Sequence, residues 1–142
     1  MGEKTEQSTA RRRVLVADDN TDAATSLGIL LEIMGHEVRV VHDGLEAVEA
    51  AALFRPDVIL LDLGMPQLTG YDACARIRAQ PQNKSALIAA LTGWTQEEHK
   101  RRSQEMGFDQ YLIKPVELAA LEKLLREYPA NRGKDAPAEG NA

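Results

Sequence analysis

The sequence contains one cysteine, Cys74, among 142 residues, so no disulfide can form within the chain. Such sparse cysteine usage is typical of a reducing compartment, and we expect a cytoplasmic protein. No apolar run approaches the roughly 20 residues that cross a bilayer. Residues 1–13 are polar and lack the apolar stretch of a signal peptide. These absences predict a protein without membrane insertion.

An excess of basic residues is also missing. The chain has 17 Lys and Arg against 22 Asp and Glu, a net charge of -5, which argues against nucleic acid as its main partner. There is no internal repeat, and the length suits one domain. Residues 1–11 and 129–142 are polar or rich in Ala, Pro and Gly, so we predict two disordered tails around a domain at 12–128.

Within that domain, strand patterns alternate five times with helix patterns. The strands are expected at 14–17, 37–40, 58–61, 86–91 and 111–113, and the helices at 21–34, 45–54, 71–79, 95–106 and 117–127. This (βα)₅ pattern predicts an α/β fold, a doubly wound parallel sheet of five strands. The continuous apolar runs favour central strands, whereas 37–40 alternates like an edge strand. The flavodoxin-like strand order 2-1-3-4-5 satisfies both requirements.

Carboxylates follow two of these strands. In such sheets ligands bind beyond the carboxyl ends of the strands where the winding reverses, here between the first and third strands. Asp18 and Asp19 end the first strand, and Asp62 ends the third. Close carboxylates repel unless a cation lies between them, and hard oxygen ligands suit Mg²⁺. Taken alone, Asp18-Asp19-Asn20 is better explained as a turn and helix cap, but Asp62 directly follows four apolar residues and is harder to explain structurally.

A hydroxyl and an ammonium group are expected at the same edge of the sheet. Thr92 ends the fourth strand and Lys114 ends the fifth. Each alone is ordinary, a β-branched strand residue and a solvated charge, so the signal is their combination with the three carboxylates. A carboxylate can attack phosphorus and form an acyl phosphate. Lys114 would supply a point charge for the phosphoryl group and Thr92 a hydrogen-bond donor.

Four strings of residues resemble one known family, the response-regulator receiver domains of two-component signalling. They are VLVADDN (14–20), DLGMPQLTG (62–70), LTG (91–93) and YLIKP (111–115). The resemblance covers about residues 13–126, and Thr92 follows Asp62 by 30 residues, as in the family. It implies the flavodoxin-like receiver fold.

The resemblance also implies roles for individual residues. Asp62 corresponds to the phosphoacceptor, and Mg²⁺ would be held by Asp19, Asp62 and the backbone carbonyl of Gly64, with Asp18 acting through a metal-bound water. The remaining family positions are the phosphate-contacting lysine, Lys114, and the switch pair, Thr92 and Tyr111. The Lys114-Pro115 bond corresponds to one that is usually cis.

We therefore expect a stand-alone response regulator that is phosphorylated on Asp62 by a histidine kinase or histidine phosphotransfer domain. It would catalyse only its own phosphorylation and dephosphorylation, and would bind a downstream protein through 95–106, Tyr111 and 117–127. One alternative is a docking module that works without phosphate, against which the intact set of site residues argues. Another is the receiver portion of a hybrid histidine kinase, although Met1 and the tail favour a free-standing protein. A third, a Mg²⁺-dependent phosphatase, typically has a second acid where Gly64 stands.

Trp94 has two open interpretations. It lies two residues after Thr92, where it is either a loop aromatic on the protein surface or a flap beside the phosphoryl site. His99 belongs to a charged stretch that is typical of a solvated helix face, so we do not expect it to relay phosphate. Cys74 is expected to be a small packed residue.

Overall fold

The computed structural model describes residues 11–93 and 107–127. Within these ranges five parallel strands form one sheet in the order β2-β1-β3-β4-β5. The elements are β1 (Arg13–Ala17), α2 (Thr21–Ile33), β2 (Glu37–Val41), α3 (Gly44–Phe54), β3 (Val58–Asp62), α4 (Gly70–Arg78), the 3₁₀ helix η1 (Pro81–Asn83), β4 (Leu87–Thr92), β5 (Gln110–Ile113) and α6 (Leu118–Glu127). The predicted strand order and fold class are confirmed.

Some predictions concern residues outside the described ranges. The helix expected at 95–106 and the position of Trp94 are among them, as are the tails except for Arg11. These remain predictions from the sequence. No helix in the described part of the chain is long and apolar enough to span a membrane.

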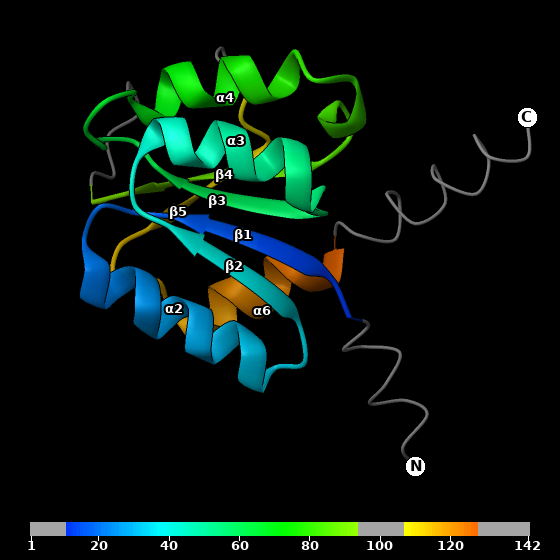
Figure 1. Cartoon of the computed structure of the whole chain (residues 1–142). Coiled ribbons are helices and arrows are strands. Elements are labelled where there is room, and N and C mark those ends of the chain that lie inside the picture. The colour runs from blue at the N-terminus through cyan, green and yellow to red at the C-terminus, as the bar shows by residue number, and fades with distance from the viewer. Residues whose placement is uncertain (1–10, 94–106, 128–142) are drawn as a thin grey trace, which may run out of the picture.

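Helices cover both faces of the sheet. Figure 1 shows α3 and α4 on one face and α2 and α6 on the other. Alternate residues of the inner strands serve the two layers: in β1, Leu15 packs in the cluster with α3 and α4, whereas Val14 and Val16 pack with α2 and α6. β3 and β4 are buried along their whole length, which explains their unbroken apolar sequences.

The two edge strands are less buried. β2 alternates between exposed and half-buried residues, as its sequence predicted. β5 has four residues, of which Leu112 alone is buried. Because an edge strand pairs on one side only, each contact outside the β4–β5 ladder contributes a larger share of what holds β5 in place.

Local side-chain hydrogen bonds start three of the helices. Asn20 accepts from the amide of Ala23 at 3.0 Å and caps α2, and Asp43 accepts from the amide of Glu46 at 2.8 Å and caps α3. Thr69 caps α4 in the same way. These caps occupy the amide groups that the first turn leaves without helical partners. The cap interpretation of the 18–20 segment therefore holds for Asn20 and is compatible with a separate role for the two acids before it.

Several predicted boundaries shift by one residue in the structure. The second predicted helix starts at Gly44 rather than at residue 45, and residues 81–83, expected as loop, form η1, which Pro81 favours at its first position. The fifth strand ends at Ile113, as expected, so Lys114 follows it directly. The amide of Lys114 still donates to Thr92 at 2.7 Å, and the following proline has no amide with which to continue the ladder. The Lys114-Pro115 bond is cis, as expected.

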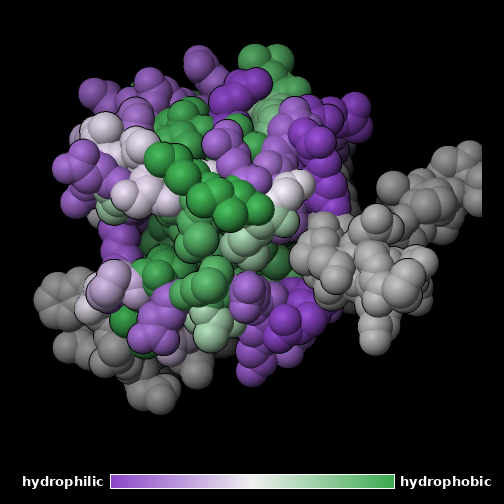
Figure 2. Space-filling view, turned by 90° about the horizontal axis from the view of Figure 1, so that it is seen from below, coloured by the Kyte–Doolittle hydropathy of each residue, from purple (hydrophilic) through white to green (hydrophobic). Residues whose placement is uncertain are grey.

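The face formed by α2 and α6 exposes apolar side chains. Figure 2 views this side and shows hydrophobic residues running through the middle of the face between hydrophilic margins. Ile29 and Ile33 of α2 and Leu118 of α6 are all exposed. Leu27 and Leu30 line a neighbouring groove of about 420 Å³, which also contains Asp18 and Lys114 at its polar end.

Candidate functional site

The three predicted carboxylates lie together at the carboxyl edge of the sheet. Asp18 and Asp19 directly follow β1, and Asp62 is the last residue of the adjacent strand β3. Because Ala17 is in register with Leu61, the next residues of the two strands are also neighbours. One carboxylate oxygen from each acid lies within 4.8 Å of the others. The predicted convergence in one crevice is confirmed.

Asp18, the buried acid of the two that follow β1, is held by contacts with its neighbours. Asp18 donates its amide to the carbonyl of Val41 at 3.2 Å, and its carboxylate accepts from the amide of Asn20 at 3.0 Å. The ring nitrogen Nδ1 of His42 lies 3.1 Å from the carbonyl oxygen of Asp18. Three contacts thus hold Asp18, whereas Asp19 is exposed.

Lys114 joins the acids from the far side of β4. Its Nζ lies 3.1 Å from Asp18 and 3.2 Å from Asp62. Burial lowers the pKa of Lys114, but the hydrogen bonds and charges of the two carboxylates outweigh that effect and leave the pKa above its ordinary value. The ammonium therefore stays charged, and it neutralises part of the acidic cluster.

Asp62 has an unusually high pKa for an aspartate. Burial and then the charge of Asp18 raise its pKa from 3.8 to about 6, against the opposing effect of Lys114. The contribution of Asp18 is the repulsion between close carboxylates that the sequence predicted. Near neutral pH the site therefore favours a further cation, and its oxygen ligands match the preference of Mg²⁺.

A cleft of about 330 Å³ opens beside Asp62. Its walls are Asp62, Leu63, Gly64, Tyr71, Leu91, Thr92 and Gly93. A Cβ on Gly64 would meet nothing within 4 Å, so the mouth of the cleft is open at this position. Thr92 is buried at the end of β4 and lines the same cleft.

The loop that follows Asp62 is pressed closely against its neighbours. A Cβ on Gly70 would lie 2.4 Å from the carbonyl oxygen of Asp62, and one on Gly44 would lie 1.9 Å from the carbonyl oxygen of Leu68. Both positions therefore require glycine for close backbone approach. The amide of Gly70 also donates to Leu63 at 3.0 Å, which closes the loop at the start of α4.

Two residues of the site were not foreseen from the sequence. Tyr71 lines the cleft, and His42 contacts the backbone of Asp18. Tyr71 follows Gly70, and its place in the cleft depends on the tight turn after Asp62. His42 directly follows β2, so the strand order could have indicated its closeness to Asp18.

Tyr111, the other member of the predicted switch pair, lies in the middle of β5 and is half-buried against the α3 and α4 side. A surface hollow of about 380 Å³ lies between β5 and α6 beside it. This hollow belongs to the predicted partner face of Tyr111 and 117–127, whereas the 95–106 part of that face is outside the described residues. Cys74 is fully buried, as expected.

A five-stranded flavodoxin-like sheet that gathers three carboxylates, a lysine and a threonine at one edge defines a receiver-type domain. Residues 14–126 match the family described as response regulator receiver domain. The chain belongs to this family, whose setting is two-component signalling.

Relatives of two kinds match the chain. It is 36% identical over 131 residues to the DNA-binding response regulator MtrA of Mycobacterium tuberculosis, a match that covers 92% of this chain and 56% of MtrA. It is 31% identical over 122 residues to an uncharacterized 14.6 kDa protein of Leptolyngbya boryana, covering 86% of this chain and 93% of that protein. The chain thus spans little more than half the length of MtrA.

Solved structures agree with this assignment. The chemotaxis protein CheY4 of Vibrio cholerae has a TM-score of 0.79 and 34% identity, with 84% of this chain and 99% of that chain covered. The receiver domain of the sensor histidine kinase PA1611 from Pseudomonas aeruginosa has a TM-score of 0.78 and 33% identity, with 85% and 99% covered. The PA1611 structure has a magnesium ion coordinated in its active-site cleft.

Proposed function

We propose that this chain is a phosphoacceptor switch in which Asp62 receives a phosphoryl group. The observation that carries the proposal is the position of Asp62, which lies between an open cleft, two further carboxylates and the ammonium of Lys114. In the reaction an oxygen of Asp62 forms a bond to phosphorus as the bond from phosphorus to the donor breaks. With a phosphohistidine donor, the leaving group is the imidazole.

The residues around Asp62 are suited to holding Mg²⁺. Asp19 and Asp62 would ligate the ion directly, together with the backbone carbonyl of Gly64, and Asp18 would act through a bound water. The chemistry that a bound Mg²⁺ supplies is neutralisation of negative charge at the nucleophile and the phosphoryl oxygens. Support for this assignment comes from the all-oxygen ligand set and from the clustering of the three carboxylates.

Lys114 and Thr92 would recognise the phosphoryl group itself. Lys114 is held at the acids by two ion pairs, and it can exchange one of them for a phosphoryl oxygen while staying charged. Thr92 lines the same cleft as Asp62 and Gly64, from which its hydroxyl would donate to the phosphoryl group. The chain would therefore act as its own catalyst of phosphorylation and dephosphorylation, not as an enzyme on other substrates.

The phosphodonor we propose is a histidine kinase or a histidine phosphotransfer domain, acting in the cytoplasm. A donor that reaches Asp62 would also meet the neighbouring apolar groove, because Asp18 and Lys114 line that groove and Lys114 forms an ion pair with Asp62. The exposed side chains of Ile29 and Ile33 extend this apolar surface along α2. Such a surface fits an apolar helix face of the donor.

The downstream response would be transmitted through the β5 side of the site, away from the groove along α2. Contact between Thr92 and the phosphoryl group would favour inward rotation of Tyr111 and change the face formed by 95–106, Tyr111 and 117–127. A free-standing regulator would use this face to bind a protein partner. The receiver portion of a hybrid kinase remains the alternative context, and the similarity to the PA1611 receiver supports it. A docking module that needs no phosphate is less consistent with the assembled acids, lysine and threonine.

Phosphorylation by a small acyl phosphate tests the proposal. The wild-type chain should gain one phosphoryl group in the presence of Mg²⁺ and none after chelation, as measured by mass spectrometry of the intact protein. Asp62→Asn should abolish the gain, and Asp19→Ala should weaken Mg²⁺ binding. Asp72→Asn, which changes an exposed carboxylate of α4, serves as the matched control. Equal labelling of the Asp62→Asn and Asp72→Asn proteins would refute the assignment.

A further inference from the structure

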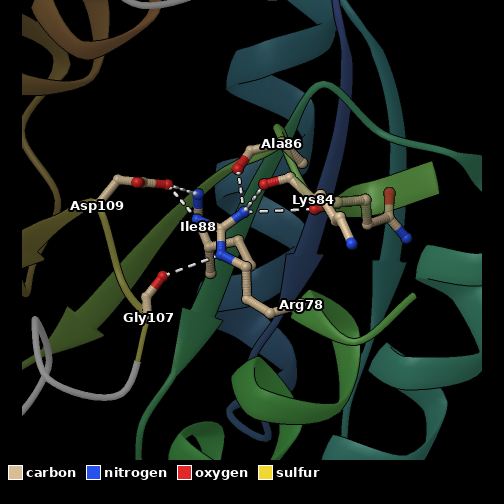
Figure 3. A network of polar contacts seen from close by, with 7 residues as sticks. Arg78, Lys84, Ala86, Ile88, Gly107 and Asp109 are labelled. Atoms are coloured by element: carbon tan, nitrogen blue, oxygen red, sulfur yellow. Dashed lines mark hydrogen bonds and ion pairs between the residues drawn. The ribbon is translucent and has the colours of Figure 1, made fainter. Parts of the chain in front are cut away.

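Arg78, the last residue of α4, makes contacts that the site chemistry does not use. Its Nε donates to the carbonyl of Gly107 at 3.1 Å, and its Nη2 forms an ion pair with Asp109. Figure 3 shows the guanidinium pointing into the space between these two residues and the segment before β4. Gly107 and Asp109 lie just ahead of β5, so Arg78 fastens the start of that strand to α4.

The same guanidinium also holds the segment that leads into β4. Its Nη1 donates to the carbonyls of Asn83 at 3.3 Å, Lys84 at 3.1 Å and Ala86 at 2.6 Å. One side chain thus joins the end of α4 to the segment before β4, which is near in sequence, and to the segment before β5, which is distant in sequence. An arginine suits this position because its planar group presents several donors in fixed directions, which a lysine cannot do.

Asp109 transmits this attachment to the sheet. Its amide donates to the carbonyl of Ile88 at 2.8 Å, and its carboxylate accepts from the amide of Ile88 at 2.9 Å. Ile88 belongs to β4, which is buried throughout and is therefore a firm reference for its neighbour. The contact precedes the first pair of the β4–β5 ladder, Ala89 with Gln110, and so it sets where β5 begins.

α4 reaches from this attachment to the acid site. At its first residue, Gly70 is packed so closely on the backbone of Asp62 that no side chain would fit. Tyr71, which lines the cleft, makes an edge-to-face contact with Phe108 at a centroid distance of 6.2 Å. The position of β5 relative to Asp62 is therefore controlled from α4 at both ends of the helix.

We propose that Arg78 is a positioning residue for Lys114: by fixing the start of β5, it keeps the Lys114 ammonium where it can contact the phosphoryl group on Asp62. The inference rests on the proposed phosphorylation of Asp62. Lys114 directly follows β5, and the hydrogen bond from its amide to the carbonyl of Thr92 joins its backbone to β4. Because β5 is a short edge strand with one buried residue, the position of its C-terminal end, next to Lys114, depends on the attachment at its N-terminal end.

Two substitutions at Arg78 and one matched control test the proposal. Arg78→Gln removes the charge and most of the hydrogen-bond donors. Arg78→Lys keeps the charge but loses the planar group with its several donors in fixed directions. Arg76→Gln changes an exposed arginine of the same helix. Amide exchange at Leu112 and Lys114 should be faster in both Arg78 variants than in the control. Phosphorylation by a small acyl phosphate should be slower by about tenfold or more, since small displacements of a positioned group have effects of this size.

A purely structural role would give a different pattern. The acids that would hold Mg²⁺ lie on β1 and β3, so the Mg²⁺ affinity of the Arg78 variants should not be weaker than that of Arg76→Gln. In a double-mutant cycle, Arg78→Gln should add little to the effect of Lys114→Ala if it acts through that lysine. Equal slowing in both backgrounds, or weakened Mg²⁺ binding, would overturn the proposal.

The outcomes also separate this inference from the proposed function. If the wild-type chain is not phosphorylated, the proposed function fails, whereas normal labelling of both Arg78 variants refutes only the role of Arg78. If Arg78→Gln does not fold, as judged by circular dichroism, Arg78→Lys carries the test. Unchanged amide exchange and an unchanged phosphorylation rate in that variant would be sufficient to reject the inference.

Discussion

Asp62 is buried and lies close to a like charge, Asp18, and to an opposite charge, Lys114. Burial and Asp18 raise its pKa to about 6, while Lys114 acts in the other direction. The carboxylate is therefore partly protonated just below neutral pH, unlike an ordinary aspartate. A nucleophile and metal ligand must be deprotonated, so protons compete with both functions.

Mg²⁺ binding should consequently depend on pH. We expect a constant dissociation constant above about pH 7 and a rise of about tenfold per pH unit well below pH 6, because each bound ion then displaces one proton. Calorimetric titration with Mg²⁺ between pH 5 and pH 8 would measure this, with Asp72→Asn as a control that keeps the profile. A flat profile would show that Asp62 is not the group that competes with the metal.

His36 is a second titratable residue in an unusual environment. It is buried, and its Nδ1 accepts from the amide of Arg12 at 3.1 Å, which only the neutral ring can do. Burial, followed by the charges of Arg12 and Arg11, lowers the pKa of His36 below 6.5. The native state therefore binds a proton at this site less readily than the unfolded chain does.

This difference predicts a loss of stability in mild acid. The contribution of His36 is fully present above about pH 6.5, and it is lost as pH falls from there toward the lowered pKa. Asp62 has the opposite sign, because its raised pKa makes the native state bind the extra proton below about pH 6. We therefore compare the wild type with His36→Gln, so that the effect of Asp62 cancels.

Urea unfolding at several values between pH 5.5 and pH 7.5 provides the measurement. The difference in unfolding free energy between the two proteins should shrink as pH falls, since the wild type alone loses the His36 contribution. A difference that is independent of pH would contradict the assigned protonation state.

At the scale of elements, the contact between α4 and β3 determines the shape of the cleft. α4 starts at Gly70 because Thr69 caps it, and the backbone of Asp62 lies directly against this first residue. The loop 63–69 is held between this contact and the close approach of Leu68 to Gly44. The cleft beside Asp62 is thus shaped by two places where no side chain fits.

Gly70→Ala should destabilise the chain by about 1–3 kcal/mol, the usual range for overpacking a rigid site. The added Cβ would meet backbone atoms of Asp62 and Leu63, which cannot move aside as a flexible side chain would. Urea denaturation measures the change. Gly64→Ala is the matched control, because its Cβ would meet no atom within 4 Å. Equal stability of the two variants would show that the loop can relax around the extra methyl group.

At the scale of the whole molecule, we propose that two sides of the site serve different functions. On one side, α2 offers an apolar surface next to the acids, and on the other, the edge strand β5 carries Tyr111 beside the hollow between β5 and α6. A phosphoryl group on Asp62 would act on the second side through Thr92, by stabilising the conformation in which that residue reaches it. Coupling of this kind is typically worth about 1–3 kcal/mol.

Loading with beryllofluoride and Mg²⁺ should therefore change amide exchange on one face. We expect changes at Tyr111 and over 117–127, and also over 95–106, while α2 stays unaffected. Thr92→Ala should leave Asp62 able to accept a phosphoryl group but weaken this response. The wild type with Mg²⁺ alone is the reference state. Changes confined to α2 would show that the signal takes another route.

Much of this molecule follows from local pattern and topology. Five alternations of strand and helix specify a parallel sheet, and the apolar character of each strand predicts its place in it. Once the order is known, Asp18, Asp19 and Asp62 must meet, because strand ends at one edge of a parallel sheet are neighbours. Thr92 and Lys114 are brought to the same edge by the same argument.

The tertiary structure decided what depends on distance and burial. The pairing of Lys114 with both Asp18 and Asp62, the raised pKa of Asp62 and the place of Tyr71 in the cleft all arise from packing between segments far apart in sequence. Arg78 shows the same limit: at the end of a polar helix it has the sequence signature of a solvated charge. Its five contacts exist because folding brings the segment before β4 and the distant segment before β5 around it.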